Sequence, residues 1–147
     1  MSMELQIQQD IKAAMLAKEK VRLESLRAIK AAIVLAKTAD GSESIADEAV
    51  VKIIQKLVKQ RKETAEIYKQ QNREELAAQE LAEAAAMEVY LPKQLGEEEL
   101  EAELKKIIAQ VGATGPQDMG KVMGTATKAL AGKAEGRMIS AMVKKLL

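Results

Sequence analysis

Apolar residues recur at intervals of three and four along nearly the whole chain, and this spacing constrains the fold more than any other feature. Such spacing places apolar side chains on one face of a helix. The strong helix formers Ala, Leu, Glu, Lys, Gln and Met dominate the composition, and no segment shows the period-two alternation of a half-buried strand. We therefore predict an all-α fold. In the N-terminal part the apolar face consists of Ile7, Ile11, Met15, Leu23, Leu26, Ile29, Ile33, Ala36, Val50, Ile53, Ile54, Leu57, Ala65 and Tyr68.

The first two helices are delimited by loop residues and by a capping pattern. The first is expected over about residues 3–38, where the polar, glycine-containing stretch "TADGSES" ends it. Ser44, with Asp47 three residues later, is similar to a capping box and predicts the start of a second helix. That helix is expected to end near "KQQN".

A third helix and a subdomain boundary follow. Asn72 with Glu75 repeats the capping signal, and the alanine-rich helix that follows should stop before Pro92, because the residue before a proline avoids helical backbone. The character of the sequence changes there. We therefore predict an N-terminal helical subdomain over residues 1–92 and a compact three-helix subdomain over residues 96–147.

The C-terminal subdomain has the cleaner apolar stripes. Glutamates at 97–99 fall in the first turn of its first helix, where the helix dipole favours them, and Gly112 is a candidate C-terminal cap. Lys144 and Lys145 lie in the last turn of the final helix. The three stripes are Leu100, Leu104, Ile107, Ile108 and Val111; Met119, Val122, Met123, Ala126 and Leu130; and Met138, Ile139, Met142, Val143 and Leu146. The four methionines are expected in the core.

Composition excludes much common chemistry. The chain has no Cys and no His, which excludes a thiolate nucleophile, an imidazole base, a Cys/His zinc site and disulfides. We predict no catalytic residue, no cofactor and no metal. The N-terminus lacks an apolar signal region, and no run approaches the roughly 18 apolar residues of a membrane span. A cytoplasmic protein without membrane partners is the expectation.

The stretch "GPQDMGKVMG", residues 115–124, is close to the phosphate-binding P-loop pattern but lacks its requirements. A helix rather than a strand is expected before it, Pro116 removes one backbone amide, and Val122 stands where a magnesium-binding Ser or Thr belongs. Pro116 instead predicts the first turn of a helix capped by Thr114 or Gly115.

Gly120 and Gly124 lie four residues apart inside that helix, where each costs about 1 kcal/mol relative to Ala. A face without side chains lets another backbone come close. We favour packing against a neighbouring helix, with approach of a sugar-phosphate backbone as the alternative.

Several stretches together resemble the YqeY-like family: "QDMGKVMG" and "GKAEGRMISAMVKKLL" near the C-terminus, and "AMLAKEKVRLESLRAIKAAI", "LVKQRKETAEIYKQQNREELAAQE" and "YLPKQLGEEEL" before them. The family is similar to the tail domain of the B subunit of glutamine-dependent aspartyl/glutamyl-tRNA amidotransferase. The resemblance covers the whole chain and implies two helical subdomains. The chain departs from the family pattern at Glu135, where Asp is usual, and at Gly96, where a Ser cap is usual.

The resemblance implies a link to carbon–nitrogen ligation with glutamine as amide donor. In that enzyme the tail domain contributes tRNA contact, whereas the kinase-like and glutaminase sites lie elsewhere. We therefore expect no independent amidotransferase activity, and we rank an autonomous ligase last.

Charge is segmented although the formal net charge is only +1. Residues 12–37 carry net +5, and residues 52–62 carry five basic residues and no acid. Residues 63–103 carry net −9 and residues 104–147 net +6. We expect the basic "KLVKQRK" stretch to pair with the acidic third helix, because neighbouring helices of opposite charge satisfy each other.

The C-terminal basic residues surround the glycines and the last loop, as a backbone-binding surface requires. With no Trp or Phe and only two Tyr, the chain offers no aromatic platform for splayed bases. We predict a non-catalytic tRNA-binding accessory module; candidate partners are tRNA and an amidotransferase or aminoacyl-tRNA synthetase. The alternatives are ordinary surface lysines paired with acids, and a protein-interaction module that binds no nucleic acid. The RNA-contact candidates are Gly120, Lys121, Gly124, Lys128, Lys133, Gly136 and Arg137.

Overall fold

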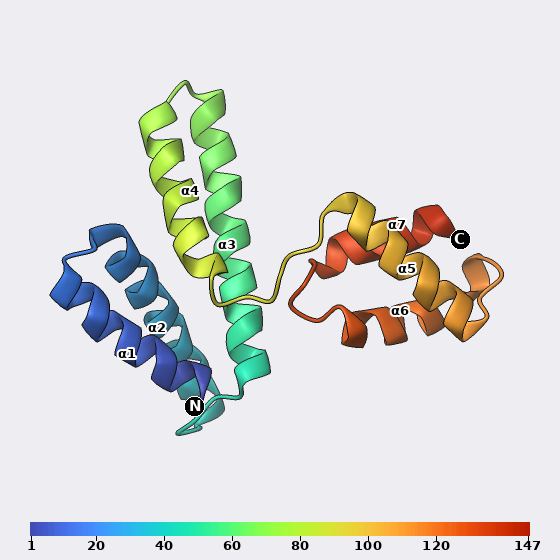
Figure 1. The fold of residues 1–147 in the computed structure, drawn as a ribbon, viewed down its shortest axis with the longest axis horizontal. Helices are drawn as coiled ribbons and strands as arrows, with labels where there is room; N and C mark the ends of the chain where they lie inside the picture. The colour runs from blue at the N-terminus through green and yellow to red at the C-terminus, as the bar shows by residue number, and fades with distance from the viewer. The chain divides into compact units, whose positions relative to one another are not determined.

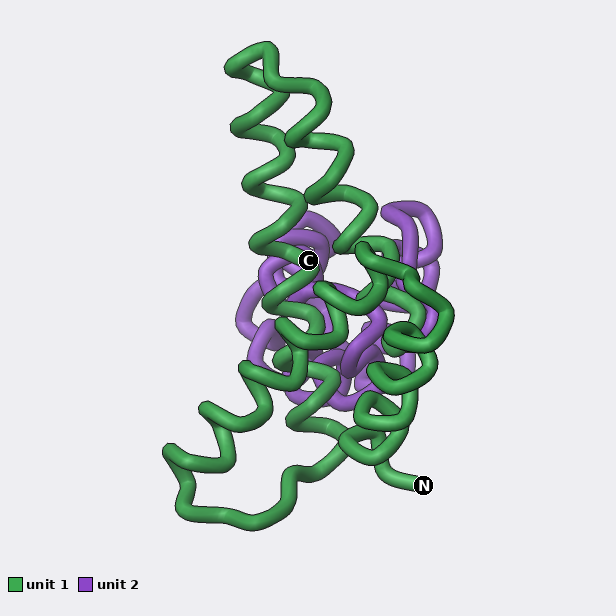
Figure 2. Tube along the Cα trace, turned by 90° about the vertical axis from the view of Figure 1, so that its left-hand side faces the viewer, with its two compact units in different colours: residues 1–91 green, residues 92–147 purple.

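The computed structural model describes all of residues 1–147, and its only regular elements are helices (Figure 1). This confirms the predicted all-α class. Two compact units, Met1–Leu91 and Pro92–Leu147, divide the chain and are described separately below (Figure 2). The elements are α1 Met3–Ala17, α2 Lys20–Asp40, α3 Asp47–Gln70, α4 Glu74–Glu88, α5 Glu97–Val111, the 3-10 helix η1 Pro116–Asp118, α6 Met119–Ala129 and α7 Gly136–Leu146.

Unit 1 is held together by apolar faces of its four helices. α3 packs along α4, and α2 packs against both α1 and α4. Burying one Leu, Ile or Val side chain contributes about 1.5–3 kcal/mol, so this shared core stabilises the arrangement of the helices. Its buried members are Ile7, Ala14, Leu26, Ile29, Ile33, Val50, Ile54, Val58, Ala84 and Met87.

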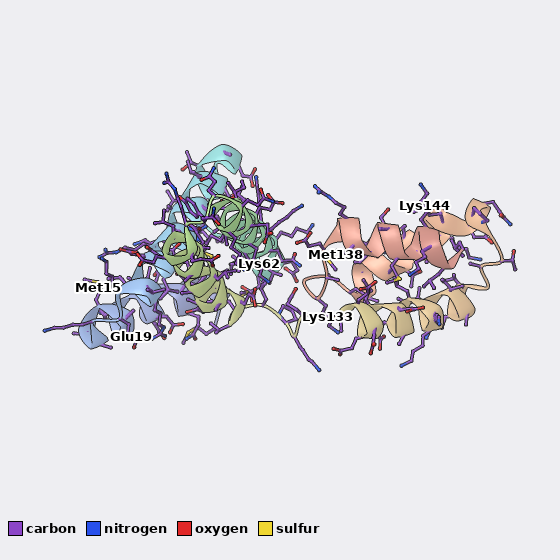
Figure 3. The ribbon with its side chains drawn as sticks, turned by 90° about the horizontal axis from the view of Figure 1, so that it is seen from above. Met15, Glu19, Lys62, Lys133, Met138 and Lys144 are labelled. Carbon is purple, nitrogen blue, oxygen red and sulfur yellow. The ribbon has the colours of Figure 1, made fainter.

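The expected single helix over residues 3–38 is wrong, because the structure has two helices there. Lys18 adopts the left-handed conformation, with φ of 58°, and its N–H donates to the carbonyl of Met15. Glu19 N–H donates to the carbonyl of Ala14, so both amides close the end of α1. Met15, which the sequence places on the apolar face, is 52% exposed beside this turn (Figure 3).

The two predicted N-terminal caps are also wrong. α3 begins at Asp47, after Ala46 rather than after Ser44, and Asp47 Oδ1 instead accepts a hydrogen bond of 3.0 Å from the N–H of Met3. Asp47 thus caps the start of α1 from another helix. Asn72 is left-handed, with φ of 60°, and does not cap α4; Arg73 precedes that helix without a side-chain cap. The predicted end of the second helix near "KQQN" is confirmed.

The expected pairing of the basic stretch with the acidic helix is confirmed. Arg61 Nε on α3 lies 3.4 Å from Glu83 Oε2 on α4, and Lys62 Nζ lies 2.6 Å from Glu88 Oε1. The buried Arg61 Nε–H has no aligned acceptor, so its contact is an ion pair rather than a hydrogen bond. Burial raises the pKa of Glu83, and the Arg61 charge only partly opposes this shift.

Unit 2 packs α5, α6 and α7 around a second core. α5 has the predicted bounds, and Gly112 caps it with φ of 69°. Met142 is buried and Met119 and Met123 are half-buried against the core, but Met138 is 46% exposed, so its predicted core position is wrong. The buried members are Leu100, Leu104, Ile107, Val122, Ala126, Leu130, Ala134, Ile139, Met142 and Val143.

Candidate nucleic-acid interface

α6 buries one side and exposes the opposite side. Its buried side consists of Val122 and Ala126, followed by Leu130 just after the helix, at the four-residue spacing of one helical face. Gly120 and Gly124 lie on the other side and are exposed. A Cβ added to either glycine would meet no atom within 4 Å outside the local helix backbone. The favoured prediction, packing against a neighbouring helix, is therefore wrong.

Two lysines share the exposed side with the glycines. We call the side that carries Gly120, Lys121, Gly124 and Lys128 the glycine face. Together with Thr125 and Ala129 these residues line one open hollow of about 620 Å³. Thr125 and Ala129 were not predicted, although Thr125 lies four residues after Lys121 and Ala129 four residues after Thr125, which is the spacing that places residues on one helix face.

The lysines of unit 2 differ in whether acids accompany them. On α5, Lys105 Nζ lies 3.3 Å from Glu101 and Lys106 Nζ lies 3.6 Å from Glu103. Lys121 and Lys128 form no such ion pair with any carboxylate of the chain. The alternative that basic residues here are ordinary paired surface charges therefore describes α5 but not the glycine face.

The nearest acid in sequence, Asp118, is engaged in local structure. Its Oδ2 accepts a hydrogen bond of 2.9 Å from the N–H of Thr114, across the η1 turn. Pro116 occupies the first position of η1 after the buried Gly115, and no side chain caps η1. This stretch, which is close to the P-loop pattern, is thus a helix start, as predicted, with Gly115 at the position before the helix. Thr114 does not cap it; its N–H and its hydroxyl both donate to Asp118 Oδ2.

The other candidate residues lie away from the glycine face. Lys133 is exposed in the loop before α7, and its carbonyl accepts a hydrogen bond of 2.9 Å from Leu95 N–H (Figure 3). It lines a different hollow, between α5 and the end of α6. Gly136 and Arg137 begin α7 and are exposed, and neither lines either hollow. The structure therefore brings together four of the seven candidates.

The usual family Asp has a longer replacement at the start of α7. Glu135 precedes the helix in extended conformation and makes no capping hydrogen bond to it, as expected for a carboxylate one methylene too long. Gly96 likewise precedes α5 without a side-chain cap. The glutamates of the first turn of α5 supply the favourable charge there instead.

Other kinds of site were sought over the whole chain. No three acidic side chains converge in a way that could hold a metal ion. No helix combines the length and the apolar character needed to cross a bilayer.

Fold and site together define a class: an all-α protein of two helical units whose C-terminal unit presents a glycine-bearing basic helical face. Residues 4–147 match the family described as Yqey-like protein. The chain belongs to this family, which confirms the resemblance inferred from its sequence.

Two fungal relatives share the name "Altered inheritance of mitochondria protein 41, mitochondrial". The protein from Meyerozyma guilliermondii is 41% identical over 86 residues, which is 58% of this chain and 44% of the relative. The protein from Pyrenophora tritici-repentis is 33% identical over 132 residues, which is 87% of this chain and 71% of the relative. The chain thus spans less than half the length of the first relative.

Proposed function

We propose that this chain is a non-catalytic tRNA-binding accessory module that holds folded RNA by its backbone at the glycine face. One observation carries the proposal: two exposed glycines and two lysines without acidic partners line the same open hollow. Paired surface charges would show lysines beside acids, as on α5.

The chemistry of the hollow suits a phosphate chain. Where side chains are absent at Gly120 and Gly124, a sugar-phosphate backbone can approach the helix closely. Lys121 and Lys128 supply point charges, and the hydroxyl of Thr125 can donate to a phosphate oxygen. These contacts carry no base information, so binding at the glycine face itself should follow the shape and charge of folded RNA rather than its sequence.

A salt series with bulk tRNA tests the proposal. Contacts from Lys121 and Lys128 on the glycine face, together with the exposed Lys133 and Arg137 that lie away from it, would neutralise up to four phosphates, which gives a slope of log K against log salt of about −3. Affinity should therefore fall about eightfold for each doubling of salt. Absence of binding at low salt, or binding that ignores salt, would overturn the proposal.

Two double variants that remove the same charge test whether the glycine face is the surface that binds tRNA. Lys121→Ala with Lys128→Ala should flatten the salt slope by about 1.5, because two phosphate contacts are lost. Lys144→Ala with Lys145→Ala removes the same charge from the last turn of α7 and should change the slope much less. Equal losses in the two double variants would show that the glycine face is not the contact surface.

We also propose that the chain does not catalyse amide transfer and acts beside an amidotransferase or an aminoacyl-tRNA synthetase. The resemblance of the sequence to the amidotransferase tail domain suggests the association, and the lack of Cys and His removes the commonest nucleophile and base. Purified chain given mischarged tRNA, ATP and glutamine should form no amidated product. Amide formation dependent on both compounds would make the chain a ligase.

A protein-interaction module is the second candidate, and exposed apolar side chains at the turn between α1 and α2 favour it. Met15 is 52% and Leu16 82% exposed. Replacing both with Lys should leave tRNA affinity unchanged or slightly higher under our first proposal. If the chain binds no tRNA at any salt concentration, this apolar surface becomes the leading functional candidate.

The compartment is also a proposal. We propose the cytoplasm, whereas both relatives carry the word mitochondrial in their names. Fractionation of cells that express the tagged chain from its own promoter decides between the two: recovery with the mitochondrial fraction would overturn the cytoplasmic assignment.

A further inference from the structure

A second hollow, which we call the α5–α6 hollow, lies between α5 and the end of α6. Its volume is about 320 Å³, at the lower end of the range for small-molecule sites. The hollow combines aliphatic and polar side chains. The aliphatic ones are Leu95, Ile107, Ala129 and Leu130, and the polar ones are Glu103, Lys106, Gln110 and Lys133.

One backbone hydrogen bond and one side-chain hydrogen bond fix the walls of this hollow. Leu95 N–H donates to the carbonyl of Lys133 over 2.9 Å, and Gln94 Nε2 donates to the carbonyl of Gly132 over 2.6 Å. The segment before α5 is thereby attached to the loop after α6. Ile107 and Leu130 belong to the buried core of unit 2, so the apolar walls are also held by packing. A preformed site of this kind loses little entropy when a ligand binds.

The α5–α6 hollow adjoins the glycine face. Ala129 lines both hollows, so the end of α6 is their common border. A chain whose phosphates lie along Lys121 and Lys128 could therefore continue past Ala129 toward Lys133 and Lys106. Both of these lysines are exposed.

We propose that the α5–α6 hollow receives one unstacked base of the RNA whose backbone lies on the glycine face; this inference rests on the proposed RNA-binding function. Flipped bases are held between aromatic or apolar side chains and are read along their hydrogen-bonding edge. Here the apolar walls are aliphatic, because the chain has no Trp or Phe.

The polar groups of the hollow select among bases. Gln110 can donate and accept at once, as an amide does when it pairs with adenine, and Glu103 can accept from an exocyclic amino group. The present contact of Glu103 with Lys106, 3.6 Å between two partly exposed groups, is weak enough to give way. An amino-bearing base, adenine above all, should therefore be preferred to uracil.

The experiment uses one RNA hairpin with three different single-stranded 3′ extensions of equal length: adenosine, uridine and abasic ribose-phosphate. All three carry the same charge, so differences in affinity at fixed salt report the base alone. The full-length chain should bind the adenosine extension about fivefold more tightly than the abasic one, with uridine nearer the abasic value.

Variants assign the preference to the hollow. Gln110→Ala should remove the preference for adenosine and leave the affinity for the abasic RNA unchanged. Gln79→Ala, the same change at an exposed position of α4, should alter neither. The glycine-face double variant should weaken all three RNAs alike.

The two levels of the proposal fail separately. Equal binding of the three RNAs, or a preference that survives Gln110→Ala, overturns the base-binding inference while the backbone-binding function stands. Failure of every RNA to bind at low salt overturns both.

Discussion

Replacing the two exposed glycines of α6 with alanine should stabilise the fold and weaken RNA binding together. A glycine inside a helix costs roughly 0.5–1 kcal/mol relative to alanine, because its backbone loses more freedom on folding. An added methyl would meet no atom within 4 Å at either Gly120 or Gly124, so no clash offsets the gain. Gly120, the second residue of α6, should contribute less than the central Gly124.

The expected stability gain for the double variant is about 1–1.5 kcal/mol. In a unit of this size that raises the melting temperature by roughly 5–10 °C, provided that unit 2 unfolds as one transition. Thermal and urea unfolding followed by circular dichroism at 222 nm measure both quantities. The RNA prediction is opposite in sign: two methyl groups prevent the closest backbone approach, and affinity for tRNA should fall about fivefold, or about 1 kcal/mol.

Gly112→Ala is the matched control for conformation. Its surroundings are equally open, with no atom within 4 Å of an added Cβ, but its φ is +69°. Alanine there should destabilise the chain by about 1 kcal/mol, because the left-handed region is strained for a residue with a Cβ. Both glycines have open space around them, but their backbone conformations differ. Alanine should therefore destabilise the chain at position 112 and stabilise it at position 124.

One result would refute the stability prediction, and another would refute the RNA-contact prediction. A loss of stability in Gly124→Ala would mean that something does pack on the face, as the sequence first suggested. A gain of stability with unchanged tRNA affinity would mean that the exposed glycines do not contact RNA.

Three further changes test unit 1. Tyr90→Phe removes the 2.6 Å hydrogen bond that the hydroxyl donates to Asp10 and should cost about 1.5 kcal/mol in urea unfolding. Burial and this bond raise the pKa of Tyr90, so its contribution is complete below about pH 10 and is lost above it, where variant and wild type should converge. Burial also raises the pKa of Glu83, so Glu83→Gln should gain stability relative to wild type as pH rises from about 4 to 7; a constant difference would contradict this. Asp47→Ala should cost about 1 kcal/mol through the lost cap on Met3, whereas Asp47→Asn should retain most of it.

The periodic spacing of apolar residues was sufficient to predict the helices of unit 2, because there each stripe is bounded by a strong local signal. Gly112 ends α5 in the left-handed conformation, and Pro116 opens the segment that leads into α6. In unit 1 the break at Lys18 has no such signal. A lysine adopts the left-handed conformation there because the packing of α1 against α2 requires a turn, and tertiary packing of this kind is invisible to local propensity.

Capping residues show the same limit. Ser44 and Asn72 satisfy the sequence rules for a cap, yet neither caps a helix. Asp47 instead accepts a hydrogen bond from the N–H of Met3, 44 residues away in sequence. A side-chain oxygen can satisfy any amide that the fold brings near it, and sequence spacing reveals only the local ones. The pairing of Arg61 with Glu83 was predictable because α3 and α4 are consecutive and opposite in charge.

The candidate site was predictable as a set of residues on one helix but not as a surface. Spacing by four places Gly120 and Gly124 on the same side of α6, yet it does not say whether another helix covers that side. The structure shows that Val122 and Ala126 face the core instead, so the glycines are exposed by the register of the helix.

That exposure changes what the glycines imply. A glycine inside a helix lowers the stability of that helix. Where a neighbouring helix covers the glycine, close packing offsets this loss, and the fold alone explains the glycine. At positions 120 and 124 the propensity cost remains and no contact within the chain offsets it. Local choices that disagree with the stability of the fold are expected at functional sites. The same helix face holds lysines without acidic partners, whereas the lysines of α5 have them. Both departures occur on one side of one helix, and the phosphate backbone that we propose for this side would account for both.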